Sequence, residues 1–137
     1  MSEMESAKAF FEACETGQGW AACQAWCHPD ASFSCQAGAL AEVTTLDGYC
    51  GWMAAIFGPI PDAHYELTAF AYDAERATAV ASAIFKGTNT GPLGSKPGTG
   101  KSVATDYVYV MQFEGGKIRH MTKVWNDVPA LKSLGWA

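Results

Sequence analysis

The spacing of apolar residues changes near the middle of the chain. In the first half they recur every three or four residues, which indicates helices with one apolar face. The pair Ser2 and Glu5 fits a capping box, so we expect a first helix that ends near Gly17. A second helix is predicted at about residues 20–27 and ends before Pro29. A third is predicted to start at residue 44 or 45 and to end before the Gly-Pro-Ile-Pro run at 58–61.

In the second half the apolar residues alternate with polar ones, which indicates strands. Strands are predicted at residues 31–36, 64–73 and 76–86 and in two long runs on either side of Gly115-Gly116; a short helical turn is predicted at 131–136. Alternate positions 77, 79, 81 and 83 are all alanine, so a helix or a flat ligand can approach that face closely. Helices followed by antiparallel strands predict an α+β fold, here one domain over residues 1–137.

The Gly115-Gly116 pair predicts a hairpin with a two-residue turn. Counted outward from that turn, Met111 faces His120 and Tyr109 faces Thr122. Because side chains alternate along a strand, one face then carries mainly apolar and aromatic residues with a few polar tips. Those residues are Thr105, Tyr107, Tyr109, Met111, Phe113, Ile118, His120, Thr122, Val124 and Asn126.

That face has the composition of a ligand site. His120 is its best acid–base candidate, because imidazole titrates near neutral pH, although a structural core histidine is an equally good interpretation. The opposite face mixes Asp106, Arg119, Lys123 and Asp127 with apolar residues, which suits ion pairs or a subunit interface. A single β-bulge would exchange the faces of all later residues and could bring Asp106 and His120 together.

Composition narrows the function classes. The chain has 137 residues, 49% of them hydrophobic, and a formal net charge of -5. Its 9 Lys and Arg residues are not clustered, which argues against binding to nucleic acid or to an anionic membrane. We find no signal-peptide pattern and no apolar run long enough to span a bilayer, so a cytoplasmic protein is expected.

Five cysteines give an odd count, and we expect reduced thiols. Cys23, Cys27 and His28 have a spacing that invites a metal interpretation, but no second ligand pair follows. We therefore predict small buried hydrophobic residues and no metal site.

Gly100-Lys101-Ser102 after a glycine-rich run resembles a phosphate-binding loop. The first glycine of that motif is misplaced, since Ser95 stands where it is required, and a strand rather than a helix follows. Nucleotide binding is therefore not expected. We interpret residues 87–100 as a flap or a plain connector at one end of the sheet.

The hairpin, the preceding Phe85-Lys86-Gly87-Thr88-Asn89-Thr90-Gly91 segment and the Val124-Trp125-Asn126-Asp127 end resemble the SnoaL-like branch of the NTF2-like superfamily. The resemblance extends over nearly the whole chain. It implies a cystatin-like cone, in which a curved antiparallel sheet wraps around an N-terminal helix and a pocket opens at the wide end. It also implies a homodimer through the outer sheet face.

In SnoaL-like polyketide cyclases an aspartate on a late strand acts as acid–base with help from a histidine, without metal or cofactor. The resemblance therefore implies His120 with Asp106 or Asp127 as catalytic residues. Tyr107, Tyr109, Asn126 and Asn89 become substrate-binding candidates. Many relatives carry His at the position of Asn89, and an amide cannot transfer a proton there.

The sequence thus favours an enzyme that abstracts a proton next to a carbonyl on a hydrophobic substrate, leading to aldol cyclisation or isomerisation. The alternative is a non-catalytic module that binds a ligand or another protein through the same fold.

Overall fold

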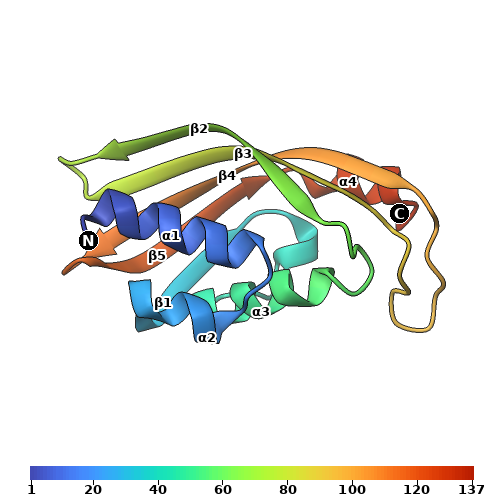
Figure 1. The fold of residues 1–137 in the computed structure, drawn as a ribbon, viewed down its shortest axis with the longest axis horizontal. Helices are drawn as coiled ribbons and strands as arrows, with labels where there is room; N and C mark the ends of the chain where they lie inside the picture. The colour runs from blue at the N-terminus through green and yellow to red at the C-terminus, as the bar shows by residue number, and fades with distance from the viewer.

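A curved five-stranded sheet, with helices packed on one side, forms the structure (Figure 1), a computed structural model that describes all 137 residues. The strand order is β1-β5-β4-β3-β2. The elements are α1 (Glu3–Glu15), α2 (Trp20–Cys23), β1 (Cys27–Cys35), α3 (Leu46–Ile56), β2 (His64–Asp73), β3 (Thr78–Thr88), β4 (Ser102–Glu114), β5 (Lys117–Trp125) and α4 (Asp127–Leu134). The predicted α+β class and cone-like fold are confirmed. None of the helices combines the length and apolar character needed to cross a bilayer.

Local capping explains where two helices begin. The Ser2 hydroxyl accepts the Glu5 N–H while the Glu5 carboxylate accepts the Ser2 N–H, which is the predicted capping box of α1. The Thr45 hydroxyl accepts the Gly48 N–H and starts α3. Both predicted starts are confirmed.

The prediction of a second helix over residues 20–27 is only partly right. α2 stops at Cys23, a 3-10 turn follows at Gln24–Trp26, and β1 begins at Cys27. Pro29 therefore lies inside a strand. It is accommodated because β1 is an edge strand and its pairing with β5 is irregular between Cys27 and Ser32. β1 runs parallel to β5, so the sheet is not antiparallel throughout.

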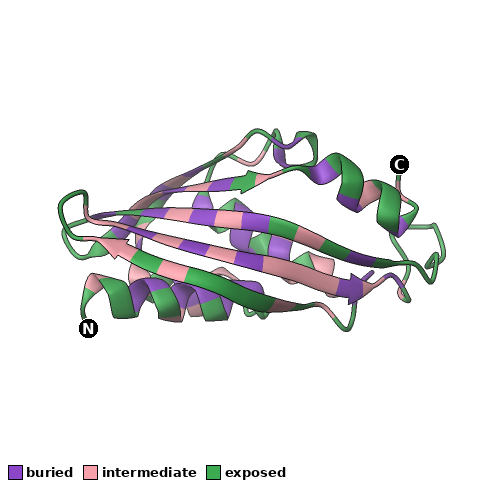
Figure 2. Ribbon diagram, turned by 90° about the horizontal axis from the view of Figure 1, so that it is seen from above, coloured by how far each residue is buried: buried purple, intermediate pink, exposed green.

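The row of small residues on β3 serves helix packing. Ala79, Ala81 and Ala83 are at most 1% exposed, and α1 lies along the same side of the sheet. Buried and more exposed residues alternate along β3, β4 and β5 (Figure 2), as expected for a sheet with one covered face. Of the two explanations for the alanine row, close packing of a helix is the one observed.

The β4–β5 hairpin has the predicted turn but not the predicted register. Gly115 and Gly116 have φ angles of 61° and 83°, which suit a tight two-residue turn, and Phe113 faces Ile118 as expected. Between Gln112 and Phe113 the register then shifts by one residue. Arg119 is the extra residue of this β-bulge.

The bulge exchanges the faces of every later residue of β5. Gln112 faces His120, Tyr109 faces Lys123 and Tyr107 faces Trp125. Lys123 and Trp125 therefore point toward the helices, and His120 points to the outer side of the sheet. The predicted inward position of His120 is wrong for this reason.

The segment between β3 and β4 is held at its base by Asn89. Its amide donates to the carbonyls of Pro59 and Gly91, both at 2.9 Å, and its side-chain oxygen accepts the Thr99 N–H at 2.8 Å and the Trp136 indole N–H at 3.1 Å. One fully buried amide thus ties this segment to the loop after α3 and to the end of the chain.

Candidate active site

A small apolar cavity of about 50 Å³ lies between α3, α4 and the ends of β3, β4 and β5. Twelve of its fifteen lining residues are hydrophobic, and the other three are Glu15, Thr105 and Lys123. The full lining is Glu15, Trp52, Met53, Ile56, Ile60, Phe85, Val103, Thr105, Tyr107, Lys123, Trp125, Ala130, Leu131, Leu134 and Trp136. An apolar lining with a few polar groups is typical of a small-molecule site.

Glu15 brings a carboxyl group into this apolar interior. It is the last residue of α1 and is 3% exposed. Its two oxygens accept hydrogen bonds from the hydroxyls of Tyr107 and Tyr109. Because the Tyr109 proton is used in this way, Tyr49, whose hydroxyl oxygen is 2.7 Å from that of Tyr109, donates to Tyr109. The result is a buried Tyr49–Tyr109–Glu15 hydrogen-bond chain.

Lys123 supplies the opposite charge. Its Nζ lies 4.5 Å from the ring centre of Trp125 and between 5.1 and 5.3 Å from those of Tyr49, Tyr107 and Trp52. No carboxylate is within ion-pair distance of Nζ. The ammonium group is therefore held by four aromatic rings and by the longer-range field of Glu15. A second pocket, of about 310 Å³, reaches Lys123 and Trp125 from the β1 edge of the sheet.

Burial and mutual attraction act in opposite directions on this pair. Burial raises the pKa of Glu15, whereas the Lys123 charge and the two tyrosine hydroxyls lower it; the net direction is upward. Burial lowers the pKa of Lys123, and the Glu15 charge opposes that shift. Desolvation thus makes the carboxylate a stronger base and the ammonium a stronger acid than they are in water, which suits proton transfer.

Glu15 is not among the residues predicted for the site, and the predicted face of Lys123 is wrong. A signal for Glu15 was present, since it follows Phe11 by four residues and so continues the apolar stripe of α1. An acidic residue in the buried stripe of a helix is uncommon enough to mark a candidate site. Lys123 was misplaced because the bulge at Arg119 leaves no recognisable signature in the sequence.

His120 lies among hydroxyl groups on the outer side of the sheet. Its Nδ1 is 2.7 Å from the Ser32 hydroxyl, and its Nε2 is 3.0 Å from that of Ser34 and 3.1 Å from that of Thr122. No carboxylate contacts the ring, and His120 does not line the cavity. The geometry does not provide the acid–base pair expected of His120.

The two candidate aspartates also lie apart from the cavity. Asp106 is exposed and faces Ile84 across the β3–β4 pair. Asp127 is buried, and its carboxylate accepts the Ala39 N–H at 2.8 Å, which attaches the start of α4 to the loop after β1. Neither aspartate forms a hydrogen bond with His120.

The four predicted substrate-binding residues divide into two groups. Tyr107 lines the cavity, and Tyr109, which does not line it, donates a hydrogen bond to the cavity residue Glu15. Asn126 is exposed at the N-cap of α4, and Asn89 is used entirely in holding the loop. The structure thus brings together the two tyrosines and adds Glu15 and Lys123, neither of which is among the predicted site residues.

The sequence model of the SnoaL-like domain matches residues 7–121. No protein of curated function matches the chain in sequence.

Among solved structures, the chain is similar to IdmH of Streptomyces antibioticus, a proposed polyketide cyclase, with a TM-score of 0.79 and 15% identity over 98% of this chain and 99% of that one. It is also similar to AclR of Streptomyces galilaeus, a proposed hydroxylase, with a TM-score of 0.76 and 18% identity over 98% of this chain and 85% of that one. A third similar structure is a cystatin-fold protein of Novosphingobium aromaticivorans, with a TM-score of 0.66 and 21% identity over 90% of this chain and 97% of that one.

At these identities the structural similarities establish the fold and nothing finer. The match of the family model over most of the chain confirms the resemblance inferred from the hairpin and the segments around it. The chain belongs to the SnoaL-like domain family.

Proposed function

We propose that the chain is a cofactor-independent enzyme that abstracts a proton next to the carbonyl group of a small hydrophobic substrate. The observation that carries the proposal is the buried Glu15 carboxyl group, held by Tyr107 and Tyr109 in an apolar cavity that also contains the Lys123 ammonium. IdmH, similar in fold, is a proposed polyketide cyclase, and this supports a carbonyl substrate.

The proposed chemistry uses Glu15 as the base. Its carboxylate takes the proton from the carbon next to the carbonyl, and its raised pKa brings its basicity closer to that needed at neutral pH. Negative charge then develops on the carbonyl oxygen, where the Lys123 ammonium stabilises it. The interaction is strong because aromatic rings rather than water surround Lys123.

The proton balance closes without an added reactant. For an isomerisation, Glu15 returns its proton to a different carbon of the enolate. For an aldol cyclisation, the enolate carbon attacks a second carbonyl of the same molecule, and Glu15 gives its proton to the alkoxide that forms.

Exchange of carbon-bound protons tests this step without knowledge of the natural substrate. The protein is incubated in D₂O with a small apolar ketone such as cyclohexanone, and loss of the α-proton signal is followed by NMR. We expect exchange above the uncatalysed rate with the unaltered chain, and none above it with Glu15→Gln. His120→Ala is the matched control and should exchange normally.

The competing function is a binding module without chemistry. It is favoured by the hydrogen bonds of Glu15, since both carboxylate oxygens already accept from tyrosine hydroxyls. Binding of apolar ketones, seen as a change in tryptophan fluorescence from Trp52 or Trp125, without any α-proton exchange, would support the module and contradict the enzyme.

We also propose that two copies pair through the outer face of the sheet. That face carries Val108 and Val110 in half-buried positions and Val124 at 58% exposure, beside the His120 hydroxyl cluster. Sedimentation of the intact chain and of a Val124→Lys variant tests the pairing, since a charge at the interface should shift the population to monomer.

A further inference from the structure

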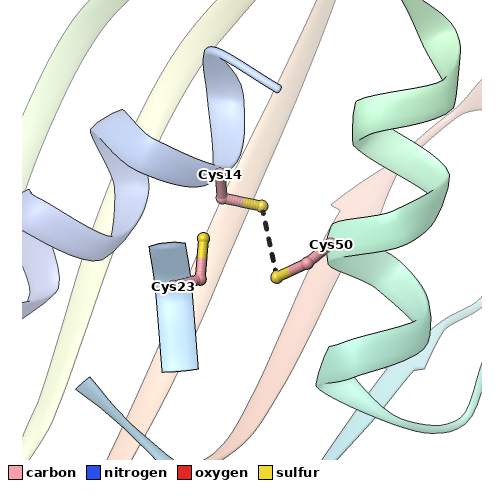
Figure 3. A group of neighbouring side chains, drawn as sticks. All are labelled: Cys14, Cys23 and Cys50. Carbon is pink, nitrogen blue, oxygen red and sulfur yellow. Dashed lines mark hydrogen bonds between the residues drawn. The ribbon is translucent and has the colours of Figure 1, made fainter. Parts of the chain in front are cut away.

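Three cysteines from three different helices meet in the interior. Figure 3 shows Cys14 of α1, Cys23 of α2 and Cys50 of α3 turning their sulfur atoms toward one another. The three Sγ atoms all lie within 4.8 Å of one another, and each residue is at most 1% exposed. None forms a disulfide. The residues are 9 and 27 positions apart in the chain, so tertiary packing rather than a local motif brings them together.

The spacing of the sulfur atoms suits a metal ion with three thiolate ligands. A zinc–sulfur bond of about 2.3 Å places the ligands of a trigonal site about 4.0 Å apart. The Cys14 and Cys50 sulfurs are 3.9 Å apart, close to that value. The remaining separations, within 4.8 Å, need to shorten by less than about 1 Å to satisfy the same geometry.

The chemistry of the surroundings selects the class of ion. The group contains sulfur donors only, with no carboxylate or imidazole among them. Thiolates favour soft and borderline ions such as Cu⁺, Zn²⁺ and Cd²⁺, and they exclude Mg²⁺ and Ca²⁺, which need oxygen ligands. The hydroxyl of Tyr109 lies 3.8 Å from the Cys14 sulfur and donates a hydrogen bond to Glu15.

Binding must also remove the thiol protons. Thiolates rather than thiols are the metal ligands, so the three cysteines release their protons to solvent as the ion binds, and the affinity rises with pH.

We propose that Cys14, Cys23 and Cys50 form a binding site for one thiophilic metal ion in three-coordinate thiolate geometry. The site is separate from the apolar cavity, since none of the three cysteines lines it. It joins α1, α2 and α3, so an ion bound there stabilises the packing of these three helices against one another. The two remaining cysteines, Cys27 and Cys35, lie outside the group.

Cadmium titration of the reduced, metal-free protein tests the site. We expect one Cd²⁺ per chain, a thiolate-to-cadmium charge-transfer band in the ultraviolet, and a higher melting temperature. Mg²⁺ should have no effect. Cys23→Ala should abolish stoichiometric binding, whereas Cys27→Ala, which removes a buried cysteine outside the group, should bind as the unaltered chain does.

X-ray absorption of the cadmium-loaded, unaltered chain keeps the test decisive if Cys23→Ala does not fold. Three sulfur neighbours around the metal are expected. The proposal is overturned if the unaltered chain binds no Cd²⁺ at micromolar concentration, if the metal has fewer than three sulfur neighbours, or if a folded Cys23→Ala variant binds as tightly as the unaltered chain.

Discussion

The Nζ atom of Lys123 lies 4.5 Å from the centre of the Trp125 ring and has no carboxylate within ion-pair distance. Lys123 is 6% exposed. A buried ammonium group is costly unless its charge is compensated, and here the compensation comes from the faces of four aromatic rings and from Glu15 at longer range. The stability of the core and the proposed chemistry therefore depend on the same two side chains.

A double-mutant cycle on Glu15 and Lys123 measures that dependence. Each single change, Glu15→Gln or Lys123→Met, leaves the other charge uncompensated inside the protein. The double variant leaves no uncompensated charge. Its loss in the free energy of unfolding should therefore be smaller than the sum of the two single losses, and the difference should be about 0.5–3 kcal/mol. The free energies of unfolding come from urea denaturation. Strict additivity would mean that the two charges do not interact.

The pH dependence of stability reports on Glu15 separately. Its folded-state pKa is raised, so from about pH 4.3 upward the folded protein retains a proton that the unfolded chain has released. The contribution of Glu15 to the free energy of unfolding is therefore fully present below that pH, and it is lost as the pH rises through the folded-state pKa. Relative to Glu15→Gln, the unaltered chain should therefore become less stable over this range.

The measurement is urea denaturation at a series of pH values. Glu42→Gln is the control, because it removes the same charge from an exposed position, and its pH profile should follow that of the unaltered chain. A Glu15→Gln profile parallel to that of the unaltered chain would contradict the raised pKa.

The hydroxyl of Tyr109 forms hydrogen bonds with both Glu15 and Tyr49, so its removal should destabilise the protein. Tyr109→Phe leaves the Tyr49 hydroxyl without its acceptor and the carboxylate with one hydrogen bond fewer. We expect a loss of about 1–3 kcal/mol in the free energy of unfolding. Tyr72→Phe also removes a bond from tyrosine to glutamate, but at the surface near Glu3, and should cost much less. Equal losses in the two variants would show that the buried Tyr49–Tyr109–Glu15 hydrogen bonds contribute no more to stability than the Tyr72–Glu3 bond.

Much of the fold could be predicted from sequence because its signals are local. The capping box of α1, the Thr45 cap and the Gly115-Gly116 turn each depend on residues within a few positions of one another. The site could not be predicted in the same way. It depends on a bulge at Arg119, and whether a strand accepts an extra residue is decided by its neighbours in the sheet.

The same distinction explains the cysteines and Asn89. Cys14, Cys23 and Cys50 carry no motif spacing, and only the packing of three helices shows that they meet. Asn89 was expected to contact a substrate because the family motif places a functional group there. Instead all of its hydrogen-bonding groups bind the protein itself.

Asn89 should therefore behave as a structural residue. Asn89→Asp replaces the two donated hydrogen bonds with a buried negative charge directed at two carbonyl oxygens. We expect a loss of at least about 3 kcal/mol, measured by urea denaturation. Asn126→Asp, the same change at an exposed helix cap, should have little effect. A folded Asn89→Asp protein of normal stability would contradict this interpretation.

Deletion variants test the bulge on which the site depends. Because Arg119 is the extra residue, its deletion should join Ile118 to His120 in a regular ladder and leave Lys123 opposite Tyr109. The expected cost is small, about 1 kcal/mol, from loss of the exposed ion pair with Asp30. Deletion of Thr122 should instead turn Lys123 outward and unfold the protein. Tryptophan fluorescence and urea denaturation distinguish the two results. If both deletions lowered the free energy of unfolding by the same amount, Arg119 would be an ordinary ladder residue. The inward direction of Lys123 would then need another cause.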